Sequence, residues 1–178
     1  IVKIKCLEGF VEHDRARLML EEGKFAQAIA LLESLVKAHP DFTAAQNNLA
    51  LAYYYVGRIS DAFAAVRKVL AADPGNLHGL CNLAIFYHHA GCREELEDLV
   101  ERLDKMVPYH QEHLFKLGTT MGVLGYHETA LKHFRRLLKN SEFYPDASLY
   151  HYAAAASCNL GRYDDARRYW KQASKLDA

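Results

Sequence analysis

The segment at residues 81–92, CNLAIFYHHAGC, holds the side chains of this sequence that are best suited to metal or redox chemistry. Two cysteines bracket two adjacent histidines, and both thiolate and neutral imidazole are good ligands for zinc. On a helix, however, the seven residues from Cys81 to His88 rise by about 10 Å, too far for one ion with bonds of about 2 Å. No CxxC or HxxxH pair occurs in the sequence. We therefore predict no metal site, and a metal-responsive module built on these residues is kept only as an alternative.

Nucleophilic catalysis would need further groups arranged around a cysteine. Cys81 or Cys158 could each pair with a nearby histidine, but the sequence offers no third residue that would orient this base. The glycines form neither a phosphate-binding fingerprint nor a recognisable oxyanion loop. The sequence therefore predicts a protein that is not an enzyme and that uses no cofactor.

The composition argues against partners that bind through bulk charge. The chain has 178 residues, and 22 Lys and Arg balance 22 Asp and Glu, so the formal net charge is zero. This balance creates no positive field for a nucleic acid or an anionic membrane surface. No apolar run reaches the roughly 18 residues that can span a bilayer. The four cysteines have scattered spacings that form no disulfide framework, so we predict a protein of a reducing compartment, the cytoplasm. The balanced charge and the lack of a long apolar run predict no nucleic-acid or membrane partner.

Five glycines mark an internal repeat that organises the sequence. The first four are 34 residues apart and the last step is 36 residues: Gly23, Gly57, Gly91, Gly125 and Gly161. A small residue stands seven positions before each of them: Ala16, Ala50, Ala84, Gly118 and Ala154. The residue five positions after the glycine is alanine in four repeats and leucine in the third. Such a period is typical of arrays in which each repeat is one supersecondary unit.

Each repeat is predicted to form two helices that are joined at its glycine. In the second repeat, apolar and small residues at helical spacing predict one helix over residues 43–56 and another over residues 59–72. Gly57 can adopt the positive φ that ends the first helix, and Asp73-Pro74 prevents the second from continuing. The small side chains of Ala50 and Ala62 would let the two helices pack closely.

This pattern of a small residue, a glycine, an alanine, a bulky residue and a closing proline resembles the tetratricopeptide repeat family. The bulky residues are Leu32, Val66, Val100, Phe134 and Trp170, and the prolines are Pro40, Pro74 and Pro108. The resemblance implies an all-α fold, a right-handed superhelical solenoid of antiparallel helix pairs. It covers residues 9–178 as a single domain, with repeats at about 9–42, 43–76, 77–110, 111–146 and 147–178. Residues 1–8 are expected to be the remnant of a preceding helix or a linker.

The resemblance also implies a concave groove that is lined by the first helix of each repeat. A rotation of about 100° per residue separates the packing face of each first helix from a second arc of side chains. The predicted peptide-binding residues on this second arc are His13, Arg17, Asn47, Asn48, Tyr54, Tyr55, His78, Asn82, His88, His89 and Phe115.

These residues have different expected roles. The carboxamides of Asn48 and Asn82 can both donate and accept, so we expect them to hold a peptide backbone. The tyrosines and Phe115 would supply apolar contact area. Arg17 and the histidines would favour acidic residues in the peptide.

Some members of the resembled family clamp a chaperone's C-terminal carboxylate with two lysines, an arginine and two asparagines. The matching positions of this chain hold His13, Arg17, Asn48, His78 and Asn82. Only Asn48 is the residue that such a clamp expects, and no lysine supplies the permanent charge on which such a grip depends. We therefore expect a different ligand.

The predicted function is a non-catalytic scaffold that binds another protein or peptide, in extended or helical form, in this groove. The alternative is a structural or assembly element. The last repeat ends without the polar capping helix that repeat arrays need for solubility. Tyr169 and Trp170 would then be contact residues at this end, including for self-association through the terminal repeats.

Overall fold

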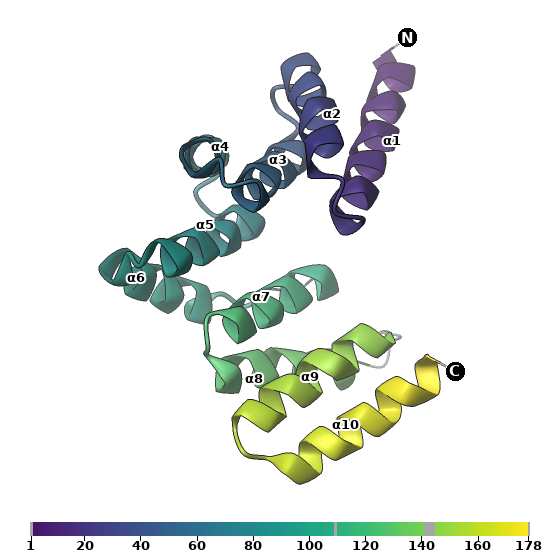
Figure 1. Cartoon of the computed structure of the whole chain (residues 1–178), viewed down its shortest axis with the longest axis vertical. Helices are drawn as coiled ribbons and strands as arrows, with labels where there is room; N and C mark the ends of the chain where they lie inside the picture. The colour runs from purple at the N-terminus through teal and green to yellow at the C-terminus, as the bar shows by residue number, and fades with distance from the viewer. Residues whose placement is uncertain (1, 109, 141–144, 178) are drawn as a thin grey trace. The chain divides into compact units, whose positions relative to one another are not determined.

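The computed structural model describes residues 2–108, 110–140 and 145–177 of the chain (Figure 1). Every regular element within these ranges is a helix. The helices are α1 (Val2–Glu21), α2 (Phe25–Ala38), α3 (Thr43–Tyr55), α4 (Ile59–Ala72), α5 (Leu77–Ala90), α6 (Arg93–Lys105), α7 (Gln111–Val123), α8 (His127–Leu138), α9 (Ala147–Asn159) and α10 (Tyr163–Leu176). The predicted all-α class is confirmed, and α3 and α4 confirm the two helices predicted for the second repeat. Residues 2–8 lie within α1, which is continuous to Glu21.

The helices form two compact units, unit 1 (residues 1–86) and unit 2 (residues 87–178). In unit 1, α1 packs on α2, α2 on α3 and α3 on α4. In unit 2, α7 packs on α8, α8 on α9 and α9 on α10. First helices of consecutive repeats also meet, because α1 contacts α3 and α7 contacts α9. These first helices carry the residues that the sequence places in the site, and a single domain over residues 9–178 stays a prediction.

The five repeat glycines all adopt the left-handed backbone conformation, as the sequence predicted for Gly57. Their φ angles range from +72° at Gly161 to +87° at Gly125. At the end of α3, the N–H of Gly57 donates to the carbonyl of Tyr54 over 3.0 Å, and the N–H of Arg58 donates to the carbonyl of Tyr53 over 2.9 Å. These bonds satisfy carbonyls that have no partner within the helix.

Small residues allow the two helices of a repeat to pack closely. Ala50 of α3 and Ala62 of α4 are fully buried and share a cluster with Val66. In unit 2, Gly118 of α7 takes the place of Ala50, and a Cβ added there would lie 2.5 Å from Cε1 of Phe134. Phe134 stands at the repeat position of Val66 and is larger. The close packing of a protein interior therefore requires glycine at position 118 where the second repeat has alanine.

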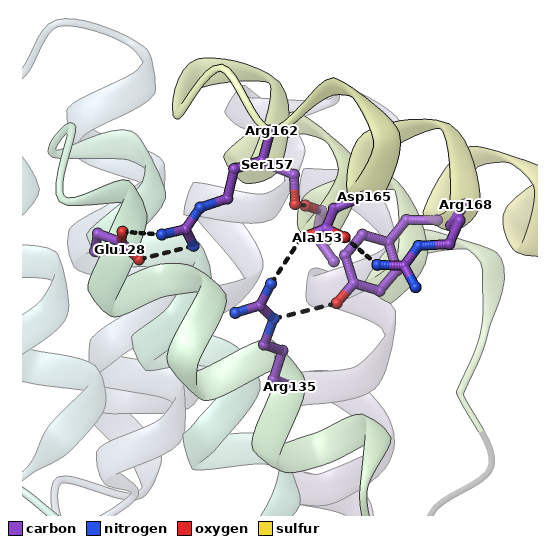
Figure 2. Close-up of polar contacts among 8 residues, drawn as sticks. Glu128, Arg135, Ala153, Ser157, Arg162, Asp165 and Arg168 are labelled. Carbon is purple, nitrogen blue, oxygen red and sulfur yellow. Dashed lines mark hydrogen bonds and ion pairs between the residues drawn. The ribbon is translucent and has the colours of Figure 1, made fainter.

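Ion pairs join α8 to α10 and to the residue that precedes α10 in unit 2 (Figure 2). The guanidinium of Arg162 donates to both carboxylate oxygens of Glu128, with 3.1 Å between Nη1 and Oε2. The guanidinium of Arg135 donates to Oδ2 of Asp165 over 3.0 Å and to the hydroxyl of Tyr169 over 3.4 Å. These partners are 30 to 34 residues apart, so the contacts fasten the last repeat to the one before it.

Candidate functional site

His13 and Asn48 meet between α1 and α3 in unit 1. The distance from Nδ2 of Asn48 to Nε2 of His13 is 2.9 Å. The centroid of the His13 ring lies 5.1 Å from that of Phe42, which precedes α3. His13 and Asn48 are 35 residues apart, and they meet because these two first helices run side by side. The structure therefore brings two predicted site residues into direct contact.

The environment of His13 favours its neutral form. Burial lowers the pKa of the imidazole below its ordinary value of 6.5, against the opposing effect of the Asp14 carboxylate. The ring is therefore neutral at pH 7 and supplies no positive charge there. The attraction to acidic peptides that the sequence suggested does not come from His13 at neutral pH.

Arg17 lies one turn further along α1 and is flanked by two carboxylates. Its Nη1 is 2.5 Å from Oε1 of Glu21, and its Nε is 3.8 Å from Oδ1 of Asp14. All three side chains are about half exposed or more, so these pairs contribute little to stability. They nevertheless leave this part of the surface with more negative than positive charge. We call the surface formed by His13, Arg17 and Asn48 the α1–α3 face.

Asn47 and Asn82 are buried, with 6% and 3% of their surfaces exposed. The amide nitrogen of Asn82 donates to the backbone carbonyl of Asn47 over 3.3 Å. The amide nitrogen of Asn47 in turn donates to Oδ1 of Asn76 over 3.0 Å, and this Oδ1 also accepts from the N–H of Gly79. Both carboxamides therefore join α3 to α5 or to the segment before it. The sequence expected Asn82 to be open to a peptide, whereas burial turns its amide nitrogen toward α3.

Tyr54 and Tyr55 belong to a chain of stacked rings in unit 1. The ring of Tyr55, which is 55% exposed, stacks on Phe25 at 5.1 Å between centroids. Tyr54 is half-buried and stacks on the buried Phe86 at 4.7 Å. The two tyrosine rings meet edge to face at 6.0 Å. An exposed aromatic side chain that is held by packed rings is well suited to contact a partner, because little side-chain entropy remains to be lost.

The other predicted histidines lie on α5. His78 is half-buried, and His88 and His89 are exposed with their ring centroids 5.2 Å apart. Cys81 of the same helix is fully buried. Among the described residues, no group of three or more His, Cys, Asp or Glu side chains is arranged to hold a metal ion.

Phe115 belongs to a cluster of three aromatic rings in unit 2. Its centroid lies 5.6 Å from that of Tyr152 on α9, and the Tyr152 ring stacks on Phe134 at 6.1 Å. Next to these rings is a pocket of about 190 Å³ between α7, α8 and α9. We call it the α7–α9 pocket; it is lined by Thr119, Gly122, Val123, His127, Phe134, Tyr152, Ala155, Ala156 and Asn159.

The two predicted end-contact residues lie on α10. Trp170 is 44% exposed. Tyr169 is half-buried, and its hydroxyl accepts the hydrogen bond from Arg135 described above. Tyr169 is thus partly engaged within unit 2, whereas Trp170 presents much of its surface to solvent.

One wall of the α7–α9 pocket was not assigned to the site from the sequence. Phe134 was expected only to pack between helices, whereas the helical angle of Tyr152 places it on the groove face of the fifth repeat. Gly118 is a signal that could have identified Phe134, because it is the one glycine among the five small positions and so marks an unusually large neighbour.

Comparisons with known proteins identify relatives of this chain. A family model described as Tetratricopeptide repeat matches residues 13–76. The TPR repeat-containing protein YvcD of Bacillus subtilis (strain 168) is 34% identical over 165 residues, which are 93% of this chain and 34% of that protein. The chain thus spans about a third of the length of this curated relative.

Solved structures support the fold. A thermophilic TPR protein of Thermus thermophilus superposes with a TM-score of 0.71 at 17% identity, covering 94% of this chain and 91% of that one. A tetratricopeptide repeat protein from Parabacteroides merdae gives a TM-score of 0.66 at 18% identity, covering 94% and 65%. At this identity the likeness concerns the fold alone. In the described part of the chain, no helix is both long and apolar enough to cross a membrane.

Proposed function

Because the chain belongs to the tetratricopeptide repeat family, we propose that it is a non-catalytic scaffold that binds another protein by a peptide segment laid across the first helices of its repeats. The segment is extended or helical. Within unit 1 the candidate contacts are the α1–α3 face and the tyrosines at the end of α3, and within unit 2 they are His88, His89 and Phe115. Asn47 and Asn82 are buried, so their role is to hold α3 to α5 and to the segment before it by hydrogen bonds.

The α7–α9 pocket is the observation that carries this proposal. Its lining is largely apolar and includes the rings of Phe134 and Tyr152 and the small residues Gly122, Ala155 and Ala156. Thr119 and Asn159 add polar groups. An aromatic-lined pocket that is open to solvent is the kind of site in which one large apolar side chain of a partner dominates affinity. We therefore assign the pocket to one aliphatic or aromatic residue of the bound segment.

The first step of a test is to identify the segment. A photo-crosslinking amino acid replaces Val123, which is 53% exposed and lines the pocket, in the protein expressed in its native host. The matched control carries the same group at Lys132, an exposed position of α8 that does not line the pocket. Mass spectrometry of the crosslinked product then gives the partner sequence. We expect a defined peptide from position 123 and none from position 132.

The second step fills the pocket without removing any packed side chain. Ala155 lies exposed on the pocket wall, so Ala155→Trp should occupy the space intended for the partner. Ala71→Trp places the same side chain at an exposed position of α4 away from the pocket and serves as the control. Fluorescence anisotropy with the synthetic peptide should show at least a tenfold rise in Kd for Ala155→Trp only. Equal Kd values for the two variants would rule out the pocket as the binding site.

An assembly role through the end of the chain remains the alternative, and one observation favours it. Three large apolar residues of α10 are substantially exposed: Tyr163, Trp170 and Leu176. If this surface carries the function, Trp170→Ala should abolish self-association in sedimentation velocity while the affinity for the crosslinked peptide is unchanged. A monomeric wild-type protein over the micromolar range would exclude this alternative.

A further inference from the structure

We infer that His13 sets the orientation of the Asn48 carboxamide, so that the α1–α3 face offers a hydrogen-bond acceptor to a partner at neutral pH and a donor once His13 is protonated. The inference rests on the proposed function in one respect, namely that the partner crosses this face. The coupling between the two side chains is independent of any partner.

The first step is the chemistry of the contact itself. The atom of Asn48 that lies 2.9 Å from Nε2 of His13 is Nδ2, and an amide nitrogen can only donate. Nε2 must therefore accept, which requires a neutral ring that carries its proton on Nδ1. This tautomer follows from the neighbour, since ring protons are assigned by the hydrogen-bond network.

The second step concerns the other end of the carboxamide. Asn48 is half-buried, and its Oδ1 has no hydrogen-bond partner among the described residues. Among the described residues, Oδ1 of Asn48 is not one of the side-chain atoms that are both fully buried and without a hydrogen-bond partner. Because it has no partner, it must be accessible to solvent. A partner that crosses the α1–α3 face at neutral pH therefore meets the carbonyl end of Asn48.

The third step asks what else the partner meets there. The guanidinium of Arg17 is engaged by Glu21 and Asp14, and the amide nitrogen of Asn82 by the Asn47 carbonyl. Together with the amide nitrogen of Asn48, three groups that could have bound a carboxylate are thus engaged within unit 1. The surface suits a segment that brings donors to it, such as backbone N–H groups or a lysine or arginine side chain. A C-terminal carboxylate would find few open donors.

Protonation of His13 reverses this arrangement. The imidazolium carries N–H groups on both nitrogens, so Nε2–H would face the N–H groups of Asn48. Rotation of the carboxamide by half a turn removes this conflict, because Oδ1 then accepts from Nε2–H. The amide nitrogen then points to the partner, and the face offers a donor where it offered an acceptor.

The groups around His13 determine where this reversal occurs. On α1 the charged neighbours are Asp14 and Arg17. From the side of α3 the ring meets Asn48, Phe42 and the backbone of Ala44, none of which titrates. The segment that precedes α3 also carries His39 and Asp41. Burial is the largest influence and holds the pKa of His13 below 6.5, so the reversal belongs to mildly acidic pH.

The test is NMR spectroscopy of the wild-type protein without a partner. Long-range ¹H–¹⁵N spectra of the His13 ring at pH 7.5 distinguish the two neutral tautomers, and we expect the proton on Nδ1. The side-chain NH₂ signals of Asn48 should then shift with the same midpoint pH as the His13 ring, while those of Asn159 should not follow it. A proton on Nε2 at pH 7.5 would overturn the inference, because Nε2 would then donate to the oxygen of Asn48.

Asn48→Asp adds a second readout. A carboxylate cannot donate, so it should move the neutral proton to Nε2 and raise the pKa of His13 by about 1 or more, as an adjacent opposite charge does. With the crosslinked peptide, wild-type affinity should fall as pH drops through the His13 midpoint, and Asn48→Asp should lose this dependence. Identical pH profiles would disprove the link to binding. Failure of Ala155→Trp to weaken binding would instead sink the proposed function and leave the tautomer result standing.

Discussion

The ring of Phe134 occupies the space into which a side chain at position 118 would project. A Cβ added to Gly118 would lie 2.5 Å from Cε1 and 2.9 Å from Cδ1 of this ring, closer than real contacts allow. The same ring is a wall of the α7–α9 pocket and stacks on Tyr152. One pair of residues, Gly118 and Phe134, therefore determines two things. It sets how closely α7 and α8 pack, and it contributes to the shape of the proposed binding pocket.

Gly118→Ala should destabilise the protein although alanine is the better helix former. Overpacking of a close-packed site costs about 1–3 kcal/mol, whereas helix propensity returns about 1 kcal/mol. We expect a net loss in the free energy of unfolding, measured by urea denaturation.

Gly122→Ala on the same helix is the control. The closest atom there is the Cβ of Ala130 at 3.9 Å, so only the propensity gain should remain. Combining Gly118→Ala with Phe134→Leu should restore much of the lost stability. Equal loss in the single and double variants would mean that the ring is not the obstacle.

Gly57→Ala tests the left-handed turn at the end of α3. The φ of Gly57 is +78°, and no atom lies within 4 Å of an added Cβ, so the substitution introduces backbone strain without a clash. We expect a loss of about 1–2 kcal/mol in the free energy of unfolding. Gly57→Asn should cost less, because asparagine tolerates this conformation better. A neutral Gly57→Ala would contradict the assigned backbone conformation.

His133 should make the protein less stable in mild acid. Its side chain is 4% exposed, and Nε2 has no hydrogen-bond partner among the described residues. Burial, followed by the charge of Lys132, lowers the pKa of His133 below 6.5. The unfolded chain therefore takes up the proton first. The contribution of neutral His133 to the free energy of unfolding is fully present above about pH 6.5. It is lost as pH falls from there through the lower pKa of the folded state.

His133→Leu should reduce this dependence on pH. The equivalent positions of two other repeats already hold Leu31 and Leu99, so leucine suits this place in the repeat. Urea denaturation between pH 5 and pH 8 should show a smaller decline for the variant than for the wild type, with His13 responsible for part of what remains. His88→Gln, at an exposed histidine, should leave the decline unchanged. An unaltered slope in His133→Leu would show that another group is responsible.

The Glu128–Arg162 pair should contribute modestly and in a salt-dependent way. Both side chains are substantially exposed, at 63% and 40%, so the expected coupling in a double-mutant cycle is about 0.2–1 kcal/mol. The cycle combines Glu128→Gln and Arg162→Met in urea denaturation at low and high salt. Arg167, which pairs with Asp164 within α10, provides a control pair with no contact between repeats. A coupling that does not weaken in 1 M salt would show that packing, and not charge, joins the two residues.

Much of the fold was predictable because the same sequence pattern recurs in each repeat. The glycines at fixed spacing predicted where first helices end, and all five have a positive φ. The predicted close approach at Ala50 and Ala62 appears as complete burial of both side chains. These features depend on local backbone geometry and on residues a few turns apart, which periodicity reports directly.

The site was less predictable, because exposure depends on the neighbouring repeat. A helical wheel separates the face of Asn82 from the packing face of α5, but it does not indicate that α3 covers that face. Helical spacing likewise does not show that the Arg17 side chain pairs with Glu21, because this depends on the rotamers of both. Nor does it show that Phe134, a packing residue, also lines a pocket. The family resemblance predicted that the first helices carry the groove, and periodicity left open which of their side chains are exposed.

The hydrogen bonds between repeats join residues that are close in the sequence for a chain of this length. The bonds from Asn48 to His13 and from Asn82 to Asn47 each span 35 residues, and the pair of Arg162 and Glu128 spans 34. Contacts that reach only the neighbouring repeat close short loops, so little loop-closure entropy is lost before they form. They also make cooperativity a nearest-neighbour property, so that folding can begin in one repeat and spread to the next.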